Sequence, residues 1–164
     1  MRSHTEAEIR KSFLNCSKGA AQRINLPKDL PDLDWEAEIF LGWIDPKSPQ
    51  SAYIVVEVED QLRGVALTKG TQKARGGAQM CQFCLTLHPA SGVSLYSIQR
   101  GKSQKDAYNT IGTYLCSDLR CSDYTQGKKK PEGIRQMDET LTLEQRCART
   151  AENVAGLVQR VAQR

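Results

Sequence analysis

The amino-acid sequence predicts an α+β fold in which antiparallel strands and a four-cysteine treble-clef zinc finger are flanked by an N-terminal and a C-terminal helix. Three observations support this prediction: alternating strand patterns joined by short turns, two cysteine pairs on either side of one predicted hairpin, and helical periodicity at both ends. With 164 residues, 39% of them hydrophobic, the chain can bury the core of one domain. We expect a single domain over 1–164, with a helix in 1–26, strands in 36–70, the zinc finger in 80–126 and a helix in 139–163.

The N-terminal helix is predicted from a cap and a periodic apolar face. Thr5 and Glu8 have the spacing of a capping box. Apolar residues then recur every three or four positions, at Ile9, Phe13, Cys16, Ala20 and Ile24. We therefore expect one helix over 5–24 that ends before Pro27, followed by the proline- and aspartate-rich connector NLPKDLPDLDW.

Five segments have the composition of strands, and four of them are predicted to form two hairpins. The first three are EIFLGWI, AYIVVEVE and LRGVALTK, of which the last two are joined by the tight link Asp60–Gln61. Ile54, Val56 and Val58 alternate onto one apolar face, which we expect to face the core. GVSLYSIQR and TIGTYLC form the second hairpin, between the two cysteine pairs.

The C-terminal segment TLTLEQRCARTAENVAGLVQRVAQ is predicted to be a long helix. Its apolar stripe is Leu143, Cys147, Ala151, Val154, Val158 and Val161. Cys16 and Cys147 fall on the stripes of the two terminal helices, where cysteine behaves as a small hydrophobic residue. We expect both thiols to be in the core.

The other four cysteines have the spacing of a structural zinc site. Cys81 and Cys84 form a C-x2-C pair, and Cys116 and Cys121 form a C-x4-C pair that leads into a short helix. Four thiolates at these spacings close a tetrahedral shell around Zn²⁺. Four buried reduced thiols, or a redox pair, are the alternatives. His88 is a possible ligand, but with four cysteines available we expect it to make an outer hydrogen bond to the site.

A closed shell of four cysteines argues against an enzyme. His4 to Glu6, followed at a distance by C-x-x-C, imitates the layout of zinc deaminases, but Cys81 follows Met80 rather than proline and the second cysteine pair would have no role. A catalytic zinc keeps an open coordination position. We expect a non-enzymatic protein whose function lies on the surface that the finger organises.

The sequence predicts a cytoplasmic protein with a basic half. The chain has neither a signal peptide pattern nor an apolar run long enough for a membrane span. Its formal net charge is +4, and basic residues concentrate in the cysteine-containing half. We expect no membrane contact and a monomer.

Aromatic residues near the cysteines are the candidates for partner binding. Phe83 lies inside the first cysteine pair, where little core is available, and Tyr114 lies two residues before Cys116. We expect both rings to be exposed in one patch, with Arg100, Lys102 and Lys128 in its basic rim. The alternatives are that Phe83 packs on the hairpin and that the cations are ordinary solvated residues. A different function, RNA or DNA binding, would use the basic loops at 69–75, 100–105 and 128–130.

The segments MCQFCLTLHP, GTYLCSDLRCS and LGWIDPKSPQSAYIVVEVEDQLRGVALT together resemble the treble-clef domain of elongation factor G-binding proteins of the fusidic-acid-resistance type. The resemblance extends from about Ile9 to the final helix and is greatest to short bacterial members that consist of this domain alone. The sequence differs from those of the resistance proteins, because their separate N-terminal helical bundle is replaced by the single predicted helix over 5–24. Ile111 also stands where a basic contact residue is expected.

The resemblance implies a zinc protein that binds elongation factor G and promotes its release from the ribosome, with possible ribosomal RNA contacts. By motif position it implies that Cys81, Cys84, Cys116 and Cys121 are the zinc ligands. It also implies that Phe83 and Tyr114 belong to the surface that binds the factor.

Overall fold

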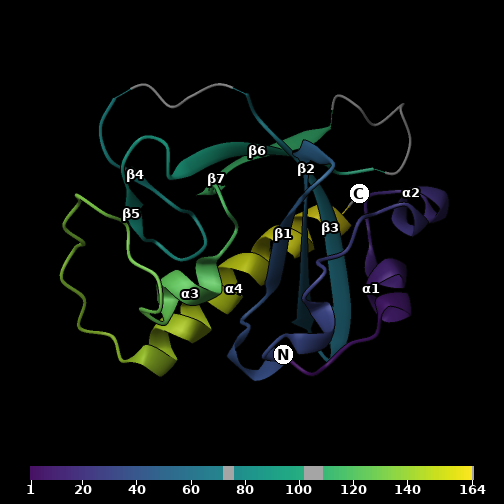
Figure 1. Ribbon diagram of the computed structural model, residues 1–164, viewed down its shortest axis with the longest axis horizontal. Coiled ribbons are helices and arrows are strands. Elements are labelled where there is room, and N and C mark those ends of the chain that lie inside the picture. Colours follow the sequence, from purple (N-terminus) through teal and green to yellow (C-terminus); the bar gives the residue numbers. More distant parts are fainter. Residues whose placement is uncertain (72–75, 102–108, 164) are drawn as a thin grey trace.

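The computed structural model describes residues 1–71, 76–101 and 109–163, and it is built around an antiparallel sheet (Figure 1). Five strands pair in the order β1-β2-β3-β6-β7, and two short strands, β4 and β5, form a separate ribbon. The strands are β1 (Leu41–Asp45), β2 (Ser48–Val58), β3 (Gln61–Lys69), β4 (Gln79–Met80), β5 (Leu87–His88), β6 (Val93–Gln99) and β7 (Thr110–Cys116).

Helices cover both faces of the sheet, as Figure 1 shows, with α1 and α2 on one side and α3 and α4 on the other. They are α1 (Glu6–Ser12), α2 (Lys18–Gln22), α3 (Cys121–Thr125) and α4 (Leu143–Ala162), with two 3-10 turns at Leu30–Asp32 and Trp35–Ala37. The predicted α+β class, with antiparallel strands and helices at both ends, is confirmed.

The β2–β3 hairpin turns at Glu59 and Asp60. Both residues have positive φ, 51° and 60°, as a two-residue turn of type I′ requires in order to match the twist of its strands. Val58 pairs with Gln61 across the turn, so the link lies one residue earlier than the predicted Asp60–Gln61. The side chain of aspartate tolerates this left-handed conformation better than most, which favours the earlier turn.

The sheet separates two apolar cores because β2 is buried on both faces. Ile54 and Val56 pack with α4 and the cysteine region, and Val58 packs against the same core, as predicted. Val55 points the other way, into a second core with Ile9 of α1. A strand that is buried on both faces has a continuous apolar run rather than strict alternation.

The N-terminal segment is two short helices, so the prediction of one helix over 5–24 is wrong. The capping box at Thr5 is present, but the helix ends at Ser12 and Phe13 forms a parallel bridge with Gly64 of β3. Asn15 then bonds the backbone of Ala66 through both ends of its amide, at 2.8 Å each. These long-range hydrogen bonds to the sheet replace the local hydrogen bonds of a continuous helix. The second helix, α2, then begins after Ser17, whose side chain is its N-cap.

The C-terminal helix is shorter than the predicted 139–163 because Thr142 caps it and Gln145 completes a capping box. Val154, Val158 and Val161 are buried as predicted, whereas Leu143 is 48% exposed because the first turn contributes nothing to the core. Cys16 and Cys147 are half-buried rather than fully buried. No helix within the described parts of the chain combines the length and apolar character that a bilayer crossing requires.

Asn15 is the polar residue on which the N-terminal packing depends. It is 7% exposed and also donates to the Gln99 carbonyl at 2.9 Å. Asn15→Ala should lower the free energy of unfolding by about 2–3 kcal/mol, because it leaves buried backbone groups unpaired. Urea denaturation measures this, with the exposed Gln159→Ala as the matched control. A loss below about 0.5 kcal/mol for Asn15→Ala would contradict the assigned role.

Glu57, at the end of β2, should make stability depend on pH. Burial acts to raise the pKa of its carboxyl, but hydrogen bonds from Arg2 and His4, both at 2.9 Å, outweigh burial and hold that pKa below its usual value. A carboxyl with a lowered folded-state pKa contributes stability above its unfolded pKa and loses it as the pH falls through the folded one. Glu57→Gln should therefore destabilise the protein at pH 7, and the difference from wild type should shrink by pH 3. An unchanged difference across that range would contradict this account, and the exposed Glu132→Gln serves as the control.

Candidate metal centre

The first cysteine pair lies on a knuckle, residues 81–84, between β4 and β5. The two strands pair Gln79 with His88 and Met80 with Leu87, which holds the ends of the knuckle together. Within it, the Phe83 N–H donates to Cys81 Sγ at 3.4 Å. Such a bond stabilises negative charge on the sulfur.

The second cysteine pair joins the end of β7 to the start of α3. Cys116 is the last residue of the strand and Cys121 the first of the helix. Between them, Leu119 turns back with φ of 55°, and its N–H donates to the Cys116 carbonyl at 2.9 Å. Leu119 is buried over Gly42 of β1, where a Cβ would lie 2.9 Å from that of Leu119, so the close approach requires glycine.

All four Sγ atoms converge at one buried point. They lie within 4.8 Å of one another, with 3.6 Å between Cys81 and Cys121 and 3.5 Å between Cys84 and Cys116. These separations exceed a disulfide bond, roughly 2.05 Å. They approach the edge of a tetrahedron, roughly 3.8 Å, that follows from zinc–sulfur bonds of 2.3 Å. The geometry fits one metal ion held by four thiolates, which is the ligand set of a structural Zn²⁺ site.

The electrostatics of the four-cysteine cluster also favour a bound cation. Burial raises the pKa of the Cys121 thiol, and its three sulfur neighbours raise it further. Four thiolates so close together repel one another unless a metal ion neutralises them. When bound, Zn²⁺ supplies that charge and links the knuckle to the β6–β7 hairpin and α3.

His88 contacts the sulfur cluster from outside, as predicted. Its Nε2 lies 3.3 Å from Cys116 Sγ, and its ring packs edge-on against Tyr124 at 4.7 Å. A Cβ on Gly92 would lie 2.6 Å from that of His88, so the ring occupies a tightly fitted slot. The metal-binding group found among the described residues contains the four cysteines and leaves His88 out. His4, which belongs to the deaminase-like pattern in the sequence, is hydrogen-bonded to Glu57 and is not part of this group.

Phe83 is buried, so the expectation of an exposed ring is wrong. The residue is 2% exposed, and its ring packs edge-on against Phe40 at 5.5 Å. Asn153 of α4 donates to the Phe83 carbonyl at 2.9 Å. The knuckle thus packs on a core that includes a helix about 70 residues away in the sequence. The spacing of the cysteines around Phe83 gives no information about that packing.

Tyr114 is exposed, and it has a neighbour that the sequence analysis missed. Tyr114 is 45% exposed and pairs across the hairpin with Leu95, which is 37% exposed. The sequence does contain a signal for Leu95. Side chains alternate between the two faces of a strand, so Leu95 lies on the opposite face from Tyr96 and, in the predicted hairpin, on the same face as Tyr114. Gln82 of the knuckle fixes the position: its N–H donates to the Tyr114 carbonyl at 2.9 Å, and its side chain accepts from the Tyr114 N–H at 3.0 Å.

Of the predicted basic rim, the structure describes Arg100 and Lys128. Arg100 donates to the carbonyls of Arg160 and Gln163, at 3.0 and 2.6 Å, so its guanidinium caps the C-terminus of α4. Lys128 is exposed in the turn after α3. Lys102 lies outside the described residues.

Comparison with known proteins agrees with this geometry. The family model described as FBP C-terminal treble-clef zinc-finger matches residues 8–161. Among solved structures, the fold is similar to that in "Structure of the fusidic acid resistance protein FusC", with a TM-score of 0.54 and 19% identity. The match covers 74% of this chain and 51% of that one, so the chain spans about half the length of that protein. Comparison with curated proteins yields no match.

Phe83 should affect stability far more than its neighbour Tyr114. Phe83→Ala removes a buried ring and should cost about 3–5 kcal/mol of unfolding free energy. The exposed Tyr114→Ala, at the same end of the sheet, should cost less than about 0.5 kcal/mol. Thermal and urea unfolding of the zinc-loaded proteins measures both. Equal effects of the two substitutions would contradict the assigned burial.

Proposed function

The chain belongs to the FBP C-terminal treble-clef zinc-finger family, and from that membership we propose that it is a non-enzymatic binding protein for elongation factor G. In this proposal Cys81, Cys84, Cys116 and Cys121 hold a structural zinc ion. The finger then presents a surface that binds the factor and promotes its release from the ribosome. In this proposal the chain acts as a monomer and as a single domain; helices from both ends of the chain pack on the same sheet, which supports the single domain.

The single observation that supports this proposal best is the exposed Tyr114–Leu95 pair. Two large apolar side chains lie side by side on the outer face of β6 and β7. Aromatic residues on rigid strands are favoured anchors for protein partners, because little side-chain entropy is lost on binding. The Gln82 hydrogen bonds tie this pair to the zinc knuckle, so metal binding positions the surface.

The metal itself is placed for a structural role. All four sulfurs are buried, and four cysteine ligands leave no open coordination position for water or substrate. Ile111, three residues before Tyr114, packs against the core instead of offering a charge. Binding at this face therefore rests on apolar contact at Tyr114.

Nucleic-acid binding is the second candidate, supported by the excess of basic residues. It is less favoured because Arg100 is occupied by the end of α4 and Lys129 by Asp118, at 2.5 Å. Binding to RNA would weaken steeply with salt and would not need the elongation factor. Titration of ribosomal RNA and of purified factor at two salt concentrations separates the two functions.

Tyr114→Ala should weaken binding to purified elongation factor G while leaving the zinc content unchanged. Loss of an anchor of this kind costs about 1–3 kcal/mol, roughly a 5- to 150-fold rise in Kd. Isothermal titration calorimetry measures the affinity, and metal analysis measures the zinc. Leu143→Ala, an exposed apolar residue at the start of α4, is the matched control and should bind like wild type. Absence of binding by the zinc-loaded wild type would overturn the proposed function.

A further inference from the structure

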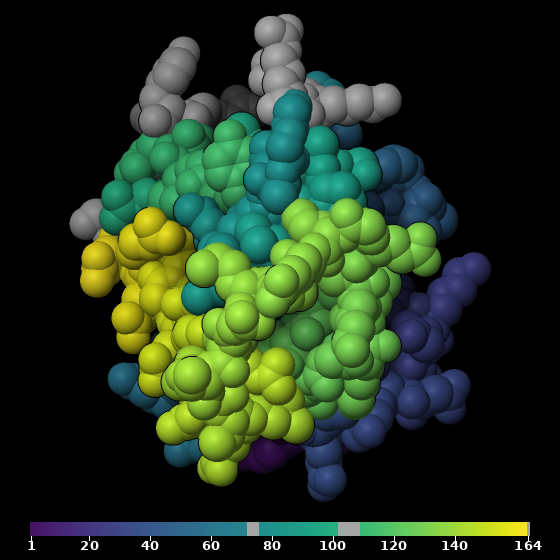
Figure 2. Space-filling view, turned by 90° about the vertical axis from the view of Figure 1, so that its left-hand side faces the viewer, coloured from purple at the N-terminus to yellow at the C-terminus, as the bar shows by residue number. Residues whose placement is uncertain are grey.

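A hollow of about 610 Å³ lies beside the zinc site, beneath the long segment that joins α3 to α4. We call this segment, residues 127–142, the strap; it contains neither helix nor strand. Figure 2 shows the strap, in yellow-green, arching across this face of the molecule with the hollow inside its arch. The volume is typical of sites for small organic ligands.

The strap is fixed in place, so the hollow is built into the fold. The Gln136 side chain behaves like a strand partner of Leu87: it accepts from the Leu87 N–H at 2.9 Å and donates to the Leu87 carbonyl at 2.8 Å. Further along the strap, Glu139 forms an ion pair with Arg149 of α4. These contacts attach the strap to the knuckle and to the helix at the same time.

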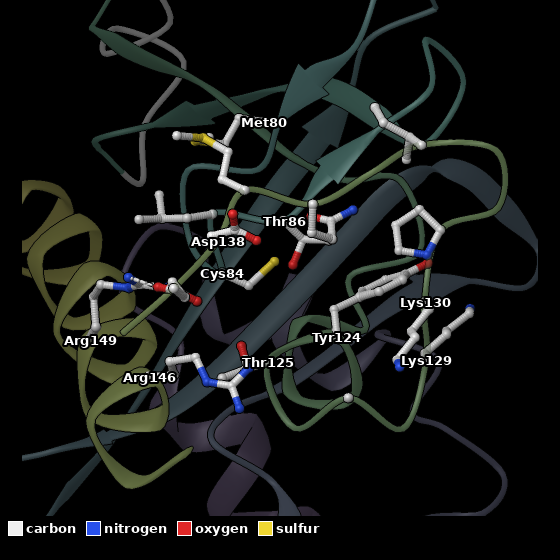
Figure 3. Close-up of a pocket in the computed structure, with 17 residues that line it drawn as sticks. Met80, Cys84, Thr86, Tyr124, Thr125, Lys129, Lys130, Asp138, Arg146 and Arg149 are labelled. Carbon is white, nitrogen blue, oxygen red and sulfur yellow. Dashed lines mark hydrogen bonds and ion pairs between the residues drawn. The ribbon is translucent and has the colours of Figure 1, made fainter. Parts of the chain in front are cut away.

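Two arginines of α4, Arg146 and Arg149, line the hollow. The Nε atoms of Arg146 and Arg149 are buried and have no hydrogen-bond partner among the described residues. The two residues lie three apart on the helix and therefore share a face; in Figure 3 both extend from α4 toward Cys84 and Thr125. Each guanidinium carries five N–H donors, and an anion in the hollow would accept hydrogen bonds from the outer ones that line it.

The charge of the lining favours an anion over a cation. Four basic and two acidic side chains line the hollow. Glu139 is paired with Arg149, whereas Arg146 has no carboxylate within ion-pair distance in the part of the chain that the structure describes. The planar guanidinium matches the two oxygens of a carboxylate or a phosphate.

The remaining walls are apolar. Met80 and Leu85 of the knuckle region and Met137 of the strap are exposed large hydrophobic residues that line the hollow. Methionine adapts its shape to varied ligands at such surfaces. The site thus has a cationic end at α4 and an apolar wall at the knuckle and the strap.

We propose that this hollow binds a small amphipathic organic anion. Its carboxylate or phosphate lies against Arg146 and Arg149, and its apolar body lies against Met80, Leu85 and Met137. The site is independent of the proposed binding of the elongation factor, since Tyr114 and Leu95 are not among its lining residues.

Binding of three matched probes to the zinc-loaded full chain tests this proposal. The probes are 1-naphthoate, 1-naphthyl phosphate and the uncharged 1-naphthamide, followed by NMR chemical-shift changes and calorimetry. We expect at least one anion to bind and to shift the amide signals of the strap and the knuckle, with the amide probe binding at least roughly 10-fold more weakly. The comparison of the two anions identifies which acidic group the site prefers.

Arg146→Met should reduce anion affinity roughly 10- to 100-fold, and Arg146→Lys should reduce it less, because lysine keeps the charge but loses the planar fork. Arg160→Met, an exposed arginine on the same helix outside the hollow, should bind like wild type. The proposal is overturned if neither anion binds, if the amide binds as well as the anions, or if Arg160→Met weakens binding as much as Arg146→Met. Both Arg146 variants are compared only as folded proteins with full zinc content, and Arg146→Lys serves as the test if Arg146→Met fails to fold.

Discussion

The convergence of four buried thiols is the constraint on which the rest of this structure depends. Cys81 and Cys84 belong to a four-residue knuckle, and Cys116 and Cys121 to the end of one strand and the start of one short helix. None of these pieces is long enough to be stable alone. A metal ion that binds all four sulfurs provides the cross-link, and its binding free energy then contributes to folding.

The same cross-link determines what the surface presents. Gln82 attaches the knuckle to Tyr114 on β7, and Asn153 attaches α4 to the knuckle carbonyl of Phe83. The exposed Tyr114–Leu95 pair and the hollow beneath the strap therefore lie on elements that share the zinc site as a common support. In the proposed binding function, the metal acts through the position that it gives to these elements.

Much of the fold could be predicted because short segments of the sequence contain the patterns that determine it. Two close cysteine pairs flanking a hairpin predict the zinc finger, and short runs rich in β-branched and aromatic residues between turns predict β2, β3, β6 and β7. The errors came from contacts between distant segments. Helical periodicity through Cys16 could not show that Asn15 bonds the sheet, and the position of Phe83 between two cysteines could not show that Phe40 and α4 cover its ring. The strap has no periodic pattern, so the hollow beneath it and the role of Arg146 became visible only in three dimensions.

X-ray absorption at the zinc edge, together with metal analysis, tests the central claim most directly. The account predicts one zinc ion per chain with four sulfur neighbours at about 2.3 Å, and loss of the folded knuckle when the metal is removed. A first shell that contains nitrogen or oxygen, or a folded knuckle in protein that holds no metal, would contradict it.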